Sequence, residues 1–262
     1  MTTAIENMFK DKVLGHPAGL FVLFFTEMWE RFSYYGMRAL LVMFFTASLL
    51  DGGWGWPREH AYAIFGTYTS LVYLSTLLGG YFADKKIGYR YAVVIGALLM
   101  TLGHGAMAVE TPFFIYLGLT LLVFGSGFFK PNMTSIISEM YKGKDEKKDG
   151  AYTIFYMGVN AGAFLGILLC GYLGEQVGWR WGFGLAGIFM LFGLLQFWFA
   201  QNIFGDIGTK PVKVDSNAVE LSPDEPKLNP FTSLQLGLIA IAGILGISWI
   251  FNDPISKISE GA

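Results

Sequence analysis

Apolar residues fill the chain in long blocks separated by short polar breaks, the pattern of a protein that crosses a membrane several times. The blocks lie near residues 18–50, 58–83, 91–109, 112–140, 151–174, 179–203 and 233–251. Each is long enough to span a bilayer as a helix, which takes about 20 residues. Gly, Pro and charged residues, which commonly end helices, occupy the breaks. The pattern therefore predicts an all-α membrane protein with seven spans.

The first block differs from the others because it contains Glu27, Glu30, Arg31 and Arg38. At about 100° per residue these four side chains and Tyr34 share one stripe of the helix, and the other faces are apolar. Unpaired at mid-membrane, the four charges would cost on the order of 10–14 kcal/mol, so the stripe must face protein or water. Glu27 and Arg31, spaced i and i+4, can pair, whereas Glu30 and Arg38 need partners elsewhere.

Two interpretations of this stripe remain open. It could be an ion-pair network that only holds helices together. It could also be a pathway for protons or a solute, which is the usual role of ionisable residues inside a membrane. We favour the pathway.

Composition supports the membrane assignment, since 53% of the residues are hydrophobic and only 15% are charged. Soluble domains have about 25% charged residues. The single cysteine, Cys170, excludes a disulfide framework, and His104 and Cys170 are interpreted as packing residues. We expect no metal and no nucleic-acid partner. Residues 1–17 lack the pattern of a cleaved signal peptide, so the first span is expected to be an uncleaved anchor.

The basic residues between spans predict the orientation. Those on one side of the membrane are Lys10, Lys12, Lys85, Lys86, Arg90, Lys142, Lys144, Lys147, Lys148, Lys210, Lys213 and Lys227. The opposite side of the first six spans holds only Arg58 and Arg180. Because cytoplasmic loops are enriched in Lys and Arg, the N-terminus is expected in the cytoplasm.

This topology divides the chain into five parts. Residues 1–17 form a cytoplasmic N-terminus and residues 18–203 a bundle of six helices. Residues 204–232, which carry four prolines and alternating charges, are expected to form a cytoplasmic linker. An extra membrane helix at 233–251 and a tail at 252–262 complete the chain.

A further charge lies inside the fourth block, where Lys130 precedes Pro131. Proline removes a backbone hydrogen bond and loosens the helix. We expect Lys130 to pair with a carboxylate of the first span and to be available to a solute carboxylate. Snorkelling to the membrane surface is disfavoured, because a dozen residues separate Lys130 from the next charged loop.

The fifth block places Tyr156 and Asn160 on one helical face, where they could read a peptide bond in a cavity. Taken alone, these two residues are better explained as contacts between helices. Tyr73 in the second block could likewise contact either a peptide or another helix.

The stretch GGYFADKKIGYR, which ends at Arg90, resembles the loop signature of the major facilitator superfamily. The matching residues are Gly80, Asp84, Lys85, Gly88 and Arg90. Gly79 and Gly80 would let two helices approach closely, and Asp84 could cap a helix or pair with a basic residue. Lys85 stands where that superfamily usually has arginine, which weakens a bidentate contact. The other interpretation is an ordinary basic cytoplasmic loop.

Three segments together resemble the proton-dependent oligopeptide transporter family. They are the run from Glu27 to Gly36, the Lys130–Pro131 site and the segment from Phe155 to Gly162. They occur in the order typical of that family, and the similarity extends over nearly all of residues 15–203.

The resemblance implies the N-terminal six-helix bundle of a major facilitator fold and a transporter that is not an enzyme. Protons would be the coupling ion, with no other cofactor. Glu27, Glu30 and Arg31 would form the proton-coupling cluster. The residues implied to contact a di- or tripeptide are Arg38, Lys130, Tyr35, Tyr73, Tyr156 and Asn160.

The resemblance also implies a partner, because members of the family carry a second bundle that this chain lacks. The extra span resembles the start of the helical hairpin that some bacterial members insert between bundles. The resulting hypothesis is proton-coupled symport of di- and tripeptides by alternating access in the cytoplasmic (inner) membrane. Two alternatives are transport of another anionic solute, such as nitrate or a carboxylate drug, and a scaffold or accessory protein without transport.

Overall fold

The computed structural model describes residues 12–210 together with Leu234 and Ile241. The predicted extra span at 233–251, apart from those two residues, lies outside the described residues. The predicted tail, linker residues 211–232 and residues 1–11 also lie outside them. The long helices within residues 12–210 are α2 (Ala18–Thr46), α3 (Arg58–Phe82), α4 (Tyr89–Met107), α5 (Pro112–Met140), α6 (Asp145–Gln176) and α7 (Trp179–Ala200).

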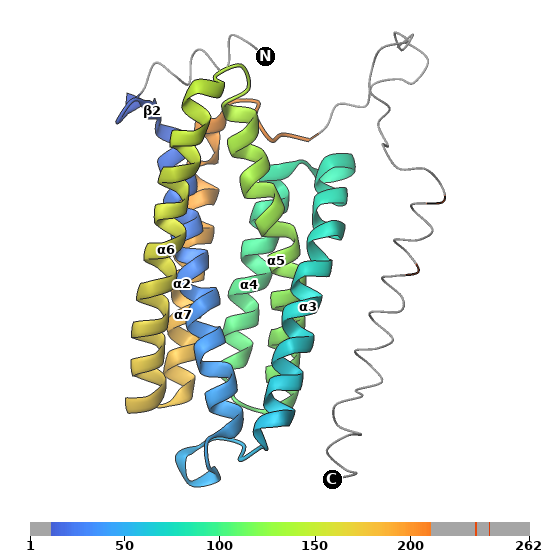
Figure 1. Cartoon of the computed structure of the whole chain (residues 1–262), viewed down its shortest axis with the longest axis vertical. Coiled ribbons are helices and arrows are strands. Elements are labelled where there is room, and N and C mark those ends of the chain that lie inside the picture. The colour runs from blue at the N-terminus through green and yellow to red at the C-terminus, as the bar shows by residue number, and fades with distance from the viewer. Residues whose placement is uncertain (1–11, 211–233, 235–240, 242–262) are drawn as a thin grey trace. The chain divides into compact units, whose positions relative to one another are not determined.

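These helices run side by side as a bundle (Figure 1). Helix α2 packs against α6 and α7, while α5 packs against α3 and α4. Two short antiparallel strands, β1 (Lys12–Val13) and β2 (His16–Pro17), precede α2. The all-α class predicted from the sequence is confirmed.

The helices begin where the sequence supplies residues that cannot continue the preceding segment. Pro57 immediately precedes α3, and Pro112 is the first residue of α5, where a missing N–H costs nothing. Gly178, with φ at 140°, precedes α7 in a conformation that side chains disfavour. These boundaries agree with the breaks between the apolar blocks.

Two boundaries differ from the apolar blocks. Helix α6 begins at Asp145 rather than near residue 151, because the acidic residues Asp145 and Glu146 favour its first turn. Helix α3 is extended by a π-helical turn, Ala83–Ile87, so the connection expected at 84–90 shrinks to Gly88, whose φ is 82°.

Five of these helices are long and apolar enough to cross a membrane: α3, α4, α5, α6 and α7. Helix α2 has the required length but contains four charged residues, Glu27, Glu30, Arg31 and Arg38. Its position in a membrane therefore depends on how those charges are accommodated.

Helix α6 meets α2 along a row of small residues spaced four apart. The row consists of Gly158, Gly162, Gly166, Cys170 and Gly174, all buried. A Cβ added at Gly162 or Gly166 would overlap a backbone carbonyl oxygen of α2. Close approach of backbones through small residues is the usual way that helices associate in lipid. The row therefore fixes α6 directly against the helix that carries the charges.

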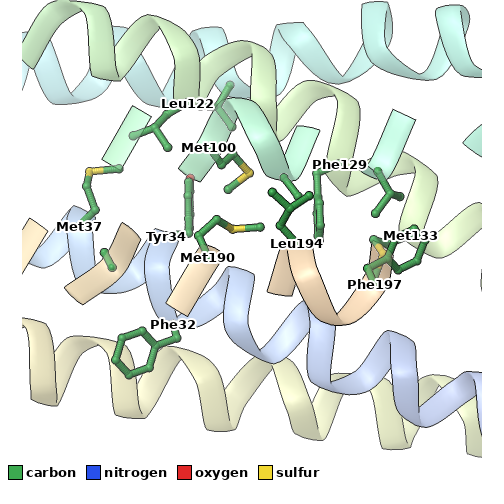
Figure 2. Packing of buried hydrophobic residues seen from close by; sticks show 14 of the residues in the cluster. Phe32, Tyr34, Met37, Met100, Leu122, Phe129, Met133, Met190, Leu194 and Phe197 are labelled. Atoms are coloured by element: carbon green, nitrogen blue, oxygen red, sulfur yellow. The ribbon is translucent and has the colours of Figure 1, made fainter. Parts of the chain in front are cut away.

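Methionine and aromatic side chains fill the space between α2, α4, α5 and α7. Figure 2 shows Met100 and Met190 near Tyr34 and Phe129. All four side chains are buried. Methionine fits irregular gaps because it is unbranched and polarizable. This core surrounds the inner side of the charged stripe.

The small-residue row leads to a stability prediction. Gly162→Leu is expected to lower the free energy of unfolding by about 1–3 kcal/mol, because the added side chain meets the carbonyl of Met28. Thermal unfolding in detergent would measure the loss. Gly171→Leu is the matched control, since a Cβ at Gly171 on the same helix meets nothing within 4 Å. Equal destabilisation by both variants would contradict backbone-to-backbone packing of α2 and α6.

Candidate functional site

Glu27, Glu30 and Arg31 form a buried ionic group on α2. One guanidinium nitrogen of Arg31, Nε, donates to Glu27 Oε1 at 2.6 Å, and a second lies 2.6 Å from the same oxygen. Arg31 Nε also lies 3.2 Å from Glu30 Oε2. Glu30 is fully buried and Glu27 is 2% exposed. The expected pairing of Glu27 with Arg31 is present, and the partner of Glu30 is the same arginine rather than a residue of another helix.

One cation thus serves two carboxylates, and most of the carboxylate oxygens have no donor. Among the buried side-chain atoms of the described residues, Glu27 Oε2 and both oxygens of Glu30 make no hydrogen bond. A buried carboxylate without donors is costly in its charged form. The two glutamates therefore share a single guanidinium, and three of their four oxygens receive no hydrogen bond within the described structure.

Lys130 does not pair with these carboxylates, which differs from the sequence-based expectation. Its ammonium nitrogen lies 3.7 Å from the centroid of the Tyr34 ring. Tyr34 is one turn beyond Glu30 on α2 and is itself 2% exposed. An ammonium group over an aromatic face is attracted by the negative face of the ring, most strongly where water is excluded. The described contact of the Lys130 ammonium is thus an aromatic ring rather than a carboxylate.

Arg38 is also held by aromatic rings. Its guanidinium carbon lies 4.8 Å from the Phe65 centroid, 5.3 Å from Tyr34 and 5.9 Å from Tyr35. Within the part of the chain that the structure describes, the ion pairs involve neither Lys130 nor Arg38. Both cations lie near the Tyr34 ring and keep their hydrogen-bond donors available.

The other predicted contact residues lie on exposed surfaces of the bundle. Tyr73 on α3 is 69% exposed and Tyr156 on α6 is 57% exposed. Asn160 is exposed as well, and its side-chain amide donates to the Tyr156 carbonyl at 3.0 Å. Tyr35 is partly buried beside Tyr34. The structure brings Tyr35 to Arg38 and leaves the other three side chains exposed on the bundle surface.

The residues of the predicted loop signature lie apart from this group, at the junction of α3 and α4. The close approach to α5 is made by Gly79, where a Cβ would overlap Gly127, whereas Gly80 has ordinary space. Asp84 lies near enough to Tyr89 to interact with it electrostatically, and no side chain of the described residues caps the π-helical turn or α4. Lys85 is exposed. Arg90 contacts the segment that follows α7.

The sequence-based site omitted the aromatic residues that hold the cations. Tyr34 shares the charged stripe, which was a usable signal, but Phe65 of α3 has none beyond being aromatic. Tyr68 is 3% exposed, and its hydroxyl is without a hydrogen-bond partner among the described residues. No group of three or more His, Cys, Asp or Glu in the described residues is placed to hold a metal ion.

A family comparison agrees with the resemblance noted from the sequence. The family model described as the POT family matches residues 90–221. This match covers α4 to α7, so it is independent of the charged stripe on α2.

Individual relatives extend the similarity to the stripe. A peptide transporter, YePEPT, of Yersinia enterocolitica is 45% identical over 186 residues, covering 70% of this chain and 36% of the relative. A di-/tripeptide transporter of Lactococcus lactis is 37% identical over 252 residues, covering 94% of this chain and 48% of the relative. The chain thus spans less than half the length of these curated relatives.

The chain is also similar to solved structures of POT family transporters. The crystal structure of a peptide transporter POT in complex with sulfate matches with a TM-score of 0.76 and 37% identity. That match covers 99% of this chain and 50% of the other. A POT family transporter in complex with 5-aminolevulinic acid matches with a TM-score of 0.75, 31% identity and the same coverage of both chains.

Proposed function

Because the chain belongs to the POT family, a family of transporters that cross the membrane several times, we propose that it supplies one bundle of a proton-coupled importer of di- and tripeptides. The observation that carries this proposal is that the buried charges of the bundle are held in two different ways. The two glutamates pair with Arg31, whereas the cations Lys130 and Arg38 lie against aromatic rings. The first group suits a proton, and the second suits an anionic end of a substrate.

The proton would bind to Glu27 or Glu30. Protonation of either glutamate leaves Arg31 with one carboxylate partner instead of two, which weakens its hold on α2. The cation released by this step would be Lys130 or Arg31. The geometry favours Arg31, because the described ion pairs of Glu27 and Glu30 are with Arg31.

The peptide carboxylate would bind to Lys130 and Arg38. Charge-assisted hydrogen bonds from an ammonium and a guanidinium are short and strong, and neither cation must first leave a described ion pair. Tyr35 would contact the same end of the peptide. Tyr73, Tyr156 and Asn160 would contact its backbone and side chains from surfaces that face the rest of the cavity.

The remaining parts of the proposal concern the whole transporter. A second bundle would close the cavity, and the two bundles would rock to expose it to either side of the cytoplasmic membrane. The N-terminus would lie in the cytoplasm, an orientation that the excess of basic residues on one side of the spans supports under the positive-inside rule.

The test is uptake of a labelled dipeptide by proteoliposomes that contain the two-bundle transporter. We expect saturable accumulation under an inward proton gradient, with competition by di- and tripeptides and little by free amino acids. Competition by nitrate or unrelated carboxylates, but not by peptides, would favour transport of another anionic solute. Absence of transport by a folded and inserted protein would favour a scaffold.

The role of the Tyr34 ring gives a separate prediction. Tyr34→Leu removes the surface under both cations, so the KM for a dipeptide is expected to rise about 10- to 30-fold, as loss of a buried cation–π contact would give. Tyr34→Phe keeps the ring and is the control. If the two variants raise KM equally, the ring is not what positions the cations.

A further inference from the structure

Residues 204–210, which we call the strap, begin at the last residue of the short 3₁₀ helix Gln201–Phe204 that follows α7. The two large apolar side chains of the strap are buried, Phe204 fully and Ile207 to 2% exposure. The Phe204 ring stacks on Phe197 of α7 with centroids 5.8 Å apart. It also reaches α2, where a Cβ at Gly19 would lie 3.0 Å from the ring. The strap is therefore packed onto the bundle.

Arg90, at the start of α4, binds the backbone of the strap at three points. Its Nε donates to the Ile207 carbonyl at 2.5 Å, and a terminal guanidinium nitrogen donates to the Gly205 carbonyl. Its backbone N–H donates to the Gly208 carbonyl at 3.0 Å. Arg90 is 8% exposed, and its guanidinium carbon lies 5.7 Å from the Phe204 centroid.

Glu139, near the end of α5, holds the strap from a second side. The Gly208 N–H donates to Glu139 Oε2 at 3.0 Å. Arg90 thus binds carbonyl oxygens of the strap, and Glu139 binds an N–H group of the same segment. Among the ion pairs of the described residues there is none between Arg90 and Glu139. Gly88 adds close packing, because a Cβ there would meet Thr209 at 2.6 Å.

From this geometry we infer that Arg90 and Glu139 are positioning residues that clamp the strap and so fix where the chain leaves the bundle after α7. Two glycines, Gly205 and Gly208, give the strap a large conformational freedom when undocked, and ordering it is costly. Hydrogen bonds from a buried guanidinium and to a carboxylate offset that cost. The arginine of the loop signature therefore acts within its own bundle, and the inference does not depend on the substrate.

The test is amide hydrogen exchange of the whole 262-residue chain in lipid nanodiscs, read by mass spectrometry. Arg90→Gln is expected to speed exchange in peptides covering residues 204–210 about tenfold or more, with the centres of α4 and α7 unchanged. Arg90→Lys keeps the charge but cannot span two carbonyls, so it should give an intermediate rate. Lys86→Gln, an exposed basic residue of the same junction, is the control and should leave the strap unchanged.

Glu139 provides an independent arm if the Arg90 variants fold poorly. Glu139→Ala removes the acceptor of the Gly208 N–H and should open the strap, whereas Glu139→Gln keeps an acceptor oxygen and should exchange like the unmodified chain. Two results would overturn the inference. One is unchanged exchange of the strap in Arg90→Gln and Glu139→Ala. The other is a uniform increase across α4, α7 and the strap, which would mean that the two residues only support the fold.

Discussion

Replacement of Lys130 by alanine in the two-bundle transporter is expected to abolish gradient-driven peptide uptake while membrane insertion is kept. The ammonium of Lys130 is held over Tyr34 without a described carboxylate partner, so a substrate carboxylate would be its counter-charge. Removing one partner of a desolvated charge pair costs about 2–5 kcal/mol, which corresponds to a loss of about 30-fold to a few thousand-fold. Initial rates of labelled dipeptide uptake would measure it.

A matched control for this variant exists in the same bundle. Lys86 also lies over an aromatic ring, with its nitrogen 5.2 Å from the Phe82 centroid, but it is exposed at the end of α3. Lys86→Ala should leave uptake nearly unchanged. Wild-type accumulation by Lys130→Ala would refute the proposed carboxylate contact.

Replacement of Glu30 by glutamine is expected to reduce gradient-driven accumulation at least about tenfold and to spare counterflow exchange, which needs no net proton movement. The amide imitates the protonated acid and cannot release a proton. Glu30 is the cleaner position to change, because it is fully buried and its oxygens accept no hydrogen bond within the described structure. Both assays would be run on the same proteoliposome preparation.

Glu27→Gln should show the same difference between the two assays but with some loss of counterflow, since Glu27 makes the 2.6 Å contact with Arg31. Glu59→Gln is the control, because Glu59 is an exposed glutamate in the first turn of α3. An equal loss in both assays for Glu30→Gln would indicate a damaged ion-pair network instead of lost proton coupling.

Much of the fold could be predicted because membrane helices need long apolar runs, and such runs are visible without knowing any contact. The boundaries that failed involve charged residues that are helical outside those runs, such as Asp145 and Glu146. The strap was interpreted as part of a linker, because two buried side chains, Phe204 and Ile207, form no periodic pattern among glycines and polar residues. Its docking depends on Arg90, which is more than a hundred residues away in the sequence.

The candidate site could likewise be predicted from the sequence only in part. Helical spacing alone predicts contacts within α2, and the Glu27–Arg31 pair is one of them. The neighbour of Lys130 depends on the rotation of α5 relative to α2. The spacing of residues along one helix does not predict that rotation. A shift of one turn on α2 decides whether the ammonium meets Glu30 or Tyr34, and the structure selects Tyr34.

The glycine row of α6 has a consequence for how the bundle responds to temperature. Where Gly158, Gly162 and Gly166 meet α2, the opposing atoms are the carbonyl oxygens of that helix. Dispersion and weak Cα–H···O contacts make this interface, and a surrounding lipid offers no hydrophobic gain for forming it. Burial of apolar surface from water is what gives protein folding its large heat-capacity change and its weakening in the cold. The α2–α6 contact gains nothing from removing apolar surface from water, so its strength should stay nearly constant on cooling.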